Sequence, residues 1–407
     1  MHTPALLILA STIALISGCS ATAKTDAQGF VIDPGFEAKL QEQLLDAKPG
    51  AVITIPAGKY AITRSLSVAV PGVTIRGVGM DKSILSFARQ NSGAEGLLVT
   101  GDDFTLQDIA IEDSKGDALK INGTKNAVMR RVRAEWTGGA KTSNGAYGLY
   151  PVQVSNVLIE ECVVKGASDA GIYVGQSTNI IVRNNRAEGN VAGIEVENST
   201  GADVYGNIVT NNTGGILVFN MPDLPVPGGK TRVYKNQVTA NNHVNFAAKG
   251  TAVASVPVGS GILVNSNDDV EIFDNDIKDN QTASVIISSF YSLGFESKRG
   301  IAAAYDPFPE NVYVTDNRFV GGGNDPGARY EPLKALGGGA LPPVLWDGFT
   351  NPKIAKAGIC VQNGDAKTLN IDGPNKAANP RIETGVDCAP ASRLPEIILP
   401  ATMLAKK

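Results

Sequence analysis

The sequence has little of what nucleic-acid-binding proteins and metalloproteins use to hold their partners. Charged residues make up 19% of its 407 residues, and the 36 Lys and Arg are scattered without a basic run. A nucleic-acid binder gathers such charges into a patch, so we expect no nucleic-acid partner. There are two His and four Cys, with no CxxC pair or Cys/His cluster, so we expect no metal site built from these residue types.

Aromatic residues are also scarce, at 6% of the chain, whereas Gly is abundant, with 45 residues. Asn-Gly, Gly-Gly and Asn-Asn pairs recur along the sequence. Such pairs mark tight turns. Because the turns are many, the composition favours an all-β fold of short strands over packed helical layers.

The longest apolar run, residues 5–16, predicts an export signal. A membrane-spanning helix needs about 20 apolar residues, and this run is shorter and is followed by small residues. The four residues that end at Cys19, Ile-Ser-Gly-Cys, resemble the lipobox of bacterial lipoproteins, and Ser20 resembles their outer-membrane sorting residue. The resemblance implies a signal peptide over residues 1–18 and a lipid on Cys19.

The same resemblance implies a lipidated tether over residues 19–30 and a location in the cell envelope, at the outer membrane of a Gram-negative bacterium. The membrane would then be contacted through the lipid anchor only. The alternative is a plain secretory signal, because the segment before the apolar run contains no Lys or Arg.

Two of the other cysteines are predicted to form a disulfide. Exported proteins meet oxidising conditions, and Cys360 and Cys388 lie in the same loop-rich tail. Cys162 instead occupies a repeat position that is otherwise Asn or apolar, so we expect a small buried thiol there.

An internal repeat of about 22 residues organises the centre of the chain. The segments Gly-Ile-Tyr-Val, Gly-Ile-Glu-Val and Gly-Ile-Leu-Val begin 22 residues apart, at Gly171, Gly193 and Gly215. Gly261 opens another Gly-Ile-Leu-Val segment 46 residues later, which leaves room for two turns and an insertion. Each repeat holds short alternating apolar stretches that cannot bury their apolar faces alone, so the repeats must stack.

Stacked repeats place equivalent residues above one another, about 4.8 Å apart. Asn tolerates the left-handed backbone of tight turns, and its amide can bond to the next repeat. We therefore expect an amide ladder from the Asn residues that share one repeat position, namely Asn185, Asn207, Asn236, Asn275 and Asn317.

Both ends of such a solenoid need caps, because they would otherwise offer unpaired strands. Residues 36–45 have apolar residues at helical spacing and precede the first predicted strand, residues 51–55. The sequence thus predicts a parallel β-helix with an N-terminal helical cap over residues 31–323. The Pro- and Gly-rich residues 324–407 are predicted to form a C-terminal cap.

The segments at residues 50–60 and 72–79, together with the repeats, resemble right-handed parallel β-helix proteins of the pectate-lyase-like class. Residues 117–219 resemble most an exported bacterial family of parallel β-helix repeat proteins without an assigned function. The wider class includes polyuronate lyases, mannuronan epimerases and accessory proteins of nitrous oxide reductase. The resemblance therefore implies the fold and leaves the function open.

Strand alternation predicts which side chains point outward from the Gly-Ile-x-Val strands. One outward column contains two Tyr, flanked by Lys and Glu, and the neighbouring column and the preceding turn add further polar and aromatic residues. The first column is Leu98, Lys120, Tyr150, Tyr173, Glu195 and Leu217; the second is Asn122, Val152, Gly175, Glu197 and Phe219; the turn adds Asp117, Tyr147 and Asp169.

Insertions flank this strand on both sides, at residues 138–144 and 242–258 before it and at residues 220–229 and 289–310 after it. Long loops on both margins would wall the face into a groove. The outward residues of the next strand, Arg130, Glu160, Arg183 and Tyr205, are interpreted as an ordinary solvated face. Plain cross-strand packing of the Tyr ladder is an equal alternative to a binding groove.

The groove lining suits a polysaccharide or another glycan, because aromatic faces stack on sugars and carboxylates bind hydroxyls. Lyases and epimerases of polyuronates need a cation, a base and an acid, which Lys120, Tyr150, Tyr173 and Glu195 could supply as catalytic residues. Hydrolysis needs two carboxylates, and Asp169 with Glu195 or Glu197 is a candidate pair. The remaining candidates for substrate binding are Asp117, Asn122, Tyr147 and Phe219.

The residues do not choose between these reactions, and the Asp-Pro-His-Asp motif of mannuronan epimerases is absent. A non-catalytic glycan-binding protein and a scaffold for another exported protein remain as alternatives. We expect no cofactor; Ca²⁺ at the acidic pairs beginning at Asp102 and Asp268 is the weaker alternative, since such pairs are more often solvated turn residues.

Labelling with radioactive palmitate tests the lipid anchor. The wild-type protein, expressed in a Gram-negative host, should incorporate the label, because acylation of the lipobox cysteine supplies its only lipid. The Cys19→Ala variant should incorporate none. Equal labelling of the two proteins would contradict the anchor.

Overall fold

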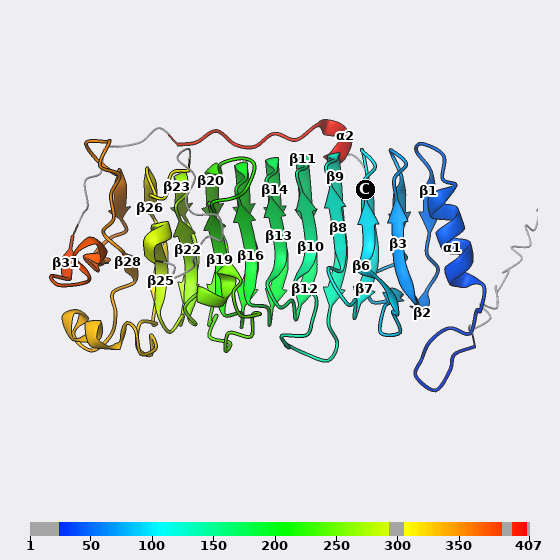
Figure 1. Ribbon diagram of the computed structural model, residues 1–407, viewed down its shortest axis with the longest axis horizontal. Helices are drawn as coiled ribbons and strands as arrows, with labels where there is room; N and C mark the ends of the chain where they lie inside the picture. Colours follow the sequence, from blue (N-terminus) through cyan, green and yellow to red (C-terminus); the bar gives the residue numbers. More distant parts are fainter. Residues whose placement is uncertain (1–23, 293–304, 385–392, 405–407) are drawn as a thin grey trace, which may run out of the picture.

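The computed structural model describes residues 24–292, 305–384 and 393–404. The predicted signal peptide, Cys19 and Cys388 lie outside the described residues. Short parallel strands stack along one axis into an elongated β-solenoid, with the N-terminal rungs at one end and the C-terminal rungs at the other (Figure 1). The predicted all-β fold, a single-stranded parallel β-helix, is confirmed.

Two parallel sheets run along the solenoid. In the described part of the chain, sheet 1 has 12 strands and sheet 2 has 19. Sheet 1 consists of β3 (Arg64–Val68), β6 (Ser92–Val99), β8 (Leu119–Asn122), β10 (Tyr147–Val152), β13 (Ala170–Gly175), β16 (Ala192–Glu197), β19 (Gly214–Phe219), β22 (Ser260–Asn265), β25 (Ala283–Ser288), β28 (Val344–Trp346), β30 (Thr368–Asn370) and β31 (Arg381–Glu383).

Sheet 2 is longer because most rungs contribute two strands to it. Its strands are β1 (Val52–Thr54), β2 (Gly58–Ala61), β4 (Thr74–Arg76), β5 (Ser83–Ser86), β7 (Thr105–Glu112), β9 (Lys125–Glu135), β11 (Ser155–Glu160), β12 (Val163–Lys165), β14 (Thr178–Arg183), β15 (Arg186–Glu188), β17 (Thr200–Tyr205), β18 (Ile208–Thr210), β20 (Gly229–Tyr234), β21 (Gln237–Thr239), β23 (Asp268–Phe273), β24 (Asp276–Lys278), β26 (Val312–Thr315), β27 (Arg318–Val320) and β29 (Ile359–Gln362).

The predicted register of the repeat is confirmed in sheet 1. Ile172 pairs with Ile194, which pairs with Ile216, and Ile216 pairs with Ile262 across the insertion. All four side chains are fully buried in the core. A repeat of one polarity pattern therefore builds a continuous apolar column inside the solenoid.

A buried ladder of asparagine amides joins consecutive rungs. Asn185 Nδ2 donates to Asn207 Oδ1 at 3.0 Å, and Asn207 Nδ2 donates to Asn236 Oδ1 at 2.9 Å. The ladder continues through Asn275 and Asn317. A second ladder has the same geometry and contains Asn190, Asn212, Asn241 and Asn280. The predicted amide ladder is thus present twice.

The N-terminal end is closed by the helix α1 (Phe36–Leu45), with the predicted bounds. Leu40 and Leu44 of α1 are buried against the first rung. The preceding segment differs from the polar tether predicted up to residue 30. Residues 24–31 fold onto the first rungs, where Phe30 bridges to Lys59 and is 7% exposed.

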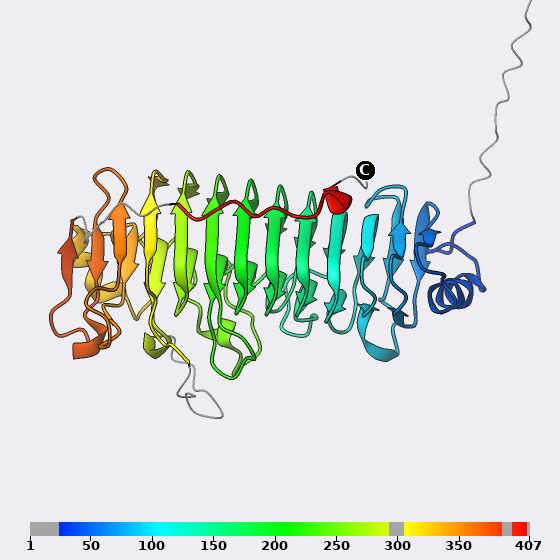
Figure 2. The ribbon, with the colours of Figure 1, turned by 90° about the horizontal axis from the view of Figure 1, so that it is seen from above.

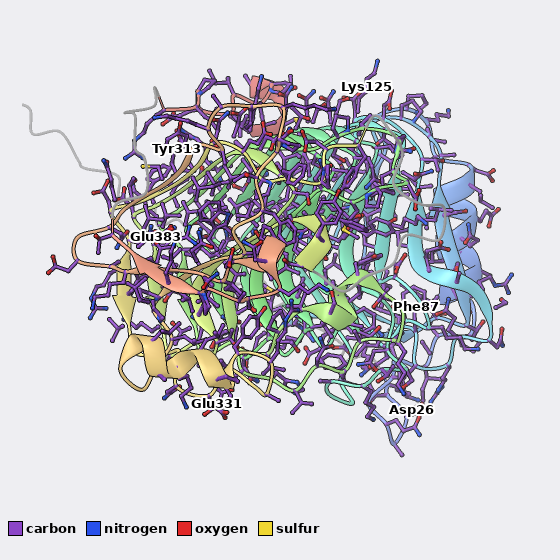
Figure 3. All side chains as sticks on the ribbon, turned by 60° about the vertical axis from the view of Figure 1, so that its left-hand side comes forward. Asp26, Phe87, Lys125, Tyr313, Glu331 and Glu383 are labelled. Carbon is purple, nitrogen blue, oxygen red and sulfur yellow. The ribbon has the colours of Figure 1, made fainter. Side chains whose placement is uncertain are left out.

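The solenoid extends further than residue 323, the predicted boundary of the C-terminal cap. The strands β28 and β29 continue sheets 1 and 2 in parallel, and β31 ends sheet 1 in antiparallel orientation. The loop between β27 and β28 contains the short helix η3 (Glu331–Gly337). Figure 3 shows Glu331 at the opposite edge of the C-terminal end from Tyr313 of β26.

The last described segment, residues 393–404, runs back along the outside of sheet 2 and ends in α2 (Ala401–Leu404) beside β9 (Figures 1 and 2). The interpretation of this face as solvated is wrong. Arg130 and Glu160 are 4% and 5% exposed and form an ion pair, and Leu399 and Met403 pack on Leu158 and its neighbours. Residues 393–404 thus cover this face of sheet 2, which the repeat pattern could not predict.

Several smaller expectations concern single residues. Cys162 is a buried free thiol, as predicted. The pairing of Cys360 with Cys388 stays a prediction, because Cys388 is not described. The carboxylates of Asp102 and Asp268 accept backbone N–H bonds, from Lys125 and Glu310, and so belong to turns.

Among the described residues, no group of three or more His, Cys, Asp and Glu is arranged to hold a metal ion. Within the same residues, no helix has the length and apolar character needed to cross a membrane.

Removing one rung of the amide ladder should destabilise the fold. Asn207→Ala leaves the backbone N–H and the Nδ2 of Asn185, which both bond to Asn207 Oδ1, without an acceptor in the core. We expect the free energy of unfolding in urea to fall by about 3 kcal/mol. The control Thr200→Ala, at an exposed position of β17, should leave it nearly unchanged. Equal stability of the two variants would contradict the role of the ladder.

Candidate functional site

The predicted outward columns of sheet 1 are present in the expected register. Tyr150 of β10 lies beside Lys120 of β8, and Tyr173 of β13 lies beside Glu195 of β16. Glu197 of the same strand pairs with Phe219 of β19. Five neighbouring rungs therefore bring these side chains to one face.

Three tyrosines form one aromatic cluster on this face. The ring centres of Tyr147 and Tyr150 are 4.5 Å apart, those of Tyr147 and Tyr173 are 4.4 Å apart, and Tyr150 meets Tyr173 edge-on at 5.0 Å. Lys120 Nζ lies 5.1 Å from the ring centre of Tyr150 and 3.9 Å from Glu95 Oε1. Lys120 is thus at the margin of the cluster and already has partners.

Three carboxyl groups gather next to the tyrosines, and we call them the acidic cluster: Asp169, Glu195 and Glu197. Glu195 is 1% exposed and Asp169 is 9% exposed, whereas Glu197 is half-buried. Tyr173 Oη donates to Glu197 Oε1 at 2.7 Å, and Gln176 Nε2 donates to Tyr173 Oη at 3.3 Å. In the described part of the chain, no Lys or Arg forms an ion pair with any of the three carboxyls.

Burial raises the pKa of each carboxyl in the acidic cluster, and repulsion by neighbouring carboxylates adds to the shift at Asp169 and Glu195. Burial, followed by the charges of Glu197 and Asp117, raises the pKa of Asp169 to about 8. Burial, followed by the charges of Glu197 and Asp169, holds the pKa of Glu195 well above its ordinary value. Among the described residues, Glu195 Oε2 is buried without a hydrogen-bond partner. An ionised Glu195 would therefore lose its hydration without a compensating donor at this oxygen, which favours its protonated form.

The surrounding groups are shifted by the same desolvation. Burial raises the pKa of Asp117 to about 6, although its bond from the Tyr147 N–H opposes the shift. Burial also raises the pKa of Tyr150 to about 12 and that of Tyr173 well above its ordinary value. The tyrosines are therefore hydrogen-bond donors at neutral pH and not bases.

The insertions close over the middle of the face instead of walling an open groove. Val253 and Val256, in the loop that contains η1 (Ala252–Ser255), pack with Leu217 and Phe219, which are both fully buried. Phe219 is thus covered by this loop, which disagrees with its expected place in an open substrate-binding column. Tyr173 and Glu195 are also covered, which disagrees with the expected exposed column.

The other predicted binding residues differ in how far they remain open. Asn122 is exposed, and Asp117, Lys120, Tyr147 and Tyr150 are half-buried. Solvent therefore reaches the acidic cluster from the side of β8 and β10 and through Glu197. Sequence reasoning missed Tyr305, whose hydroxyl donates to the Asn220 carbonyl at 2.6 Å, because this residue lies in an insertion outside the repeat.

The raised pKa of Asp169 predicts how stability depends on pH. Below its ordinary pKa of 3.8 the group is protonated in both states, but up to about pH 8 only the folded state keeps the proton. The wild type therefore loses stability as pH rises through this range. Urea unfolding should show Asp169→Asn gaining stability relative to the wild type from pH 4.5 to pH 8. If the difference in the free energy of unfolding between Asp169→Asn and the wild type did not change with pH, the raised pKa of Asp169 would be contradicted. The control is Glu188→Gln, on β15.

Solved structures of other proteins resemble this chain in fold. Among solved structures, the A-module of a mannuronan C-5 epimerase from Azotobacter vinelandii is 17% identical, covers 80% of this chain and 90% of its own, and has a TM-score of 0.50. A DFA-IIIase from Arthrobacter chlorophenolicus A6 is 12% identical, with 82% and 80% covered and a TM-score of 0.49. An alginate lyase is 15% identical, with 75% and 73% covered and a TM-score of 0.44.

Because the epimerase A-module is only 17% identical to this chain, its similarity supports the fold and no more. No curated protein sequence matches the chain. The family described as the right handed beta helix region matches residues 72–226 and 141–375, two overlapping stretches that together include all the strands of the acidic and tyrosine clusters. Since the matched residues make up most of the sequence, the chain belongs to the right-handed β-helix family.

Proposed function

We propose that the protein is a carbohydrate-active β-helix enzyme that processes a polysaccharide or another glycan at the acidic cluster of sheet 1. The observation that carries the proposal is the gathering of two buried carboxyls, Asp169 and Glu195, with the half-buried Glu197, all with raised pKa values and none paired with a cation among the described residues. Such a group is costly for stability. Carboxyls whose pKa values are raised in this way are typical of sites that transfer protons.

The arrangement suits cleavage of a glycosidic bond. A carboxyl that stays protonated at neutral pH can donate to the leaving oxygen, and a second, ionised carboxyl can act as base or nucleophile. Asp169 or Glu195 has the raised pKa that the acid needs. Glu197 accepts the hydroxyl of Tyr173 and is the more exposed glutamate, so it suits the ionised role.

Elimination or epimerisation of a uronate is the second candidate reaction. It requires a cation near the sugar carboxylate and a base for the C5 proton. Lys120 is a candidate cation at the margin of the cluster, but it already lies against Tyr150 and Glu95. The raised pKa of Tyr150 makes this residue a poor base at neutral pH. The residues present therefore favour a neutral sugar at the acidic cluster.

The half-open margin of the cluster supplies the groups that would contact the glycan. Tyr147 and Tyr150 are half-buried, so parts of their rings remain available for stacking on sugars, and the exposed Asn122 can bond to hydroxyls. Asp117 lies at the same margin. The similar A-module is named for an activity on mannuronan, which is compatible with a glycan site on this fold.

We also propose that the protein is exported and held in the cell envelope by lipid on Cys19. The first described residues, 24–31, lie at the N-terminal end of the solenoid (Figure 1). An anchor preceding them would attach the solenoid by that end. The acidic cluster, on rungs farther along the axis, would then stand away from the membrane surface.

Turnover of a panel of neutral and acidic polysaccharides tests the catalytic proposal. Reducing-end release should appear with at least one of them, and unsaturated-uronate absorbance should not. Glu195→Gln and Glu197→Gln should each lower the rate by about 100-fold or more, because each removes one proton-transfer group. Glu188→Gln, at a half-buried carboxylate paired with Arg186 on sheet 2, should keep the wild-type rate.

Two results would replace the proposal. Full activity in both glutamate variants would move the chemistry away from the acidic cluster. Binding of a glycan without any cleavage would assign a non-catalytic binding role. Circular dichroism of each variant checks the fold, since Glu195 is buried.

A further inference from the structure

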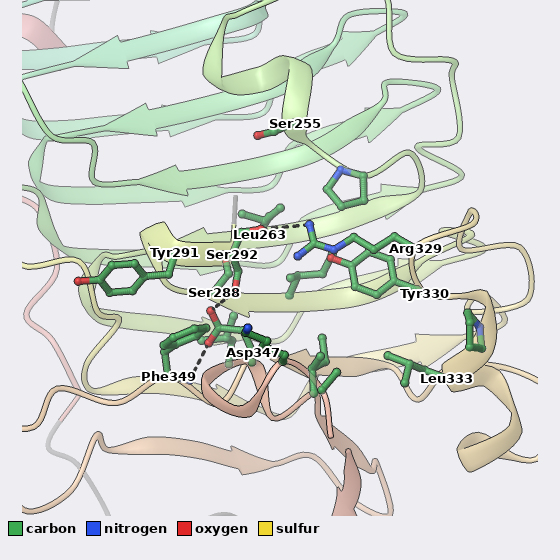
Figure 4. Close-up of a pocket in the computed structure, with 18 residues that line it drawn as sticks. Ser255, Leu263, Ser288, Tyr291, Ser292, Arg329, Tyr330, Leu333, Asp347 and Phe349 are labelled. Carbon is green, nitrogen blue, oxygen red and sulfur yellow. Dashed lines mark hydrogen bonds between the residues drawn. The ribbon is translucent and has the colours of Figure 1, made fainter. Parts of the chain in front are cut away.

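A cavity of about 460 Å³ lies over sheet 1 near its C-terminal end, apart from the acidic cluster (Figure 4). Its floor includes Leu263 of β22 and Ile286 of β25, which occupy the same outward column as Glu195. Tyr330 and Leu333 lie on one side, and Tyr291 and Phe349 lie on the other (Figure 4). The size is that of a small-molecule site, and the lining is largely apolar and aromatic.

Covered rungs separate this cavity from the acidic cluster. Leu217 lies in the column between Glu195 and Leu263, and it is fully buried beneath the loop that contains Val253 and Val256. One continuous glycan strand along the open face therefore cannot fill both places. The cavity is a site of its own.

The mouth of the cavity carries positive charge without a carboxylate partner. Arg329 Nη1 donates to the Ser292 carbonyl at 3.1 Å, and its guanidinium lies 5.3 Å from the ring centre of Tyr330. Within the described ranges, neither Arg329 nor Lys376 forms an ion pair. Figure 4 shows Arg329 extending from beside Tyr330 toward Ser292, over the space between the aromatic walls.

Among the described residues that line the cavity, Asp347 is the one carboxylate, and its oxygens accept hydrogen bonds from neighbouring groups of the wall. Its Oδ2 accepts the backbone N–H of Ser289 at 2.6 Å and the hydroxyls of Ser289 and Ser292 at 2.7 Å each. Its Oδ1 accepts the N–H of Phe349 at 3.1 Å. Asp347 therefore holds the wall together and leaves the guanidinium of Arg329 available to a ligand.

We propose that this cavity binds an organic anion with an aromatic body, of the aryl carboxylate or aryl sulfonate class. The aromatic body would lie on Leu263 and Ile286 between Tyr330 and Phe349. The anionic group would bind Arg329, whose planar guanidinium suits carboxylate and sulfonate oxygens. The second cation, Lys376, adds to the positive potential at the mouth. This site is independent of the glycan chemistry proposed above.

Two fluorescent probes that differ mainly in charge test the proposal on the full chain. 8-Anilinonaphthalene-1-sulfonate carries an aryl body and a sulfonate, and N-phenyl-1-naphthylamine has the same aryl body without the charge. The wild type should bind one equivalent of the anion saturably, and it should bind the neutral compound more weakly. The ratio of the two affinities measures how much the positive charges at the mouth contribute to binding.

Arg329→Gln should weaken the sulfonate by about tenfold, which is the loss expected for a charge-assisted hydrogen bond, and should leave the neutral probe unchanged. Ser255→Trp, which fills part of the cavity, should weaken both probes. Arg318→Gln, on sheet 2, is the control for removing an exposed positive charge. Because Arg329 and Arg318 are exposed, neither substitution should disturb folding.

Three outcomes would overturn the assignment. The first is the absence of saturable binding of the sulfonate. The second is equal affinity of the wild type and Arg329→Gln for it, which would place the anion elsewhere. The third is equal loss of both probes in Arg329→Gln, which would make the cavity a site for neutral apolar compounds.

Discussion

The structure depends on one constraint, that every rung must satisfy the backbone and amide groups of the rungs on both sides. A parallel strand in this solenoid has no partner within its own rung, so its N–H and C=O groups must be satisfied by its neighbours. The two asparagine ladders repeat the same demand in the core, where each amide donates to the next along the axis. A shift of one residue in the register of a strand would turn its apolar side chains outward and leave the asparagine amides without hydrogen-bond partners.

The fixed register explains how the acidic cluster can exist. Tyr173 and Glu195 are held side by side because Ile172 and Ile194 are locked in the core beneath them. The loop with Val253 and Val256 packs in one cluster with Leu217, which is the neighbour of Glu195 on the next rung. Burial keeps a proton on carboxyls that would be ionised on an open sheet. Rigid rungs supply position, and the loops supply the electrostatic environment.

The difference between the repeated rungs and the inserted loops also explains what the sequence could predict. The repeat spacing predicts the fold, the core residues, the amide ladder and the neighbours in each outward column, because all of these follow from local periodicity. The burial of Phe219 and Glu195 could not be predicted, because it depends on how inserted loops fold back. The tail on sheet 2 covers Arg130 and Glu160 through contacts between residues more than 200 positions apart, such as that between Arg130 and Met403. Likewise, the cavity at Arg329 forms between a tail loop and distant rungs.

The central claim is that the acidic cluster holds a proton at neutral pH, and infrared spectroscopy tests it most directly. A protonated carboxyl has a C=O stretch that is separate from the bands of ionised carboxylates. The wild type at pH 7 should show this band, and Glu195→Gln and Asp169→Asn should reduce it while Glu188→Gln leaves it unchanged. A wild-type spectrum at pH 7 without any protonated-carboxyl band would contradict the account.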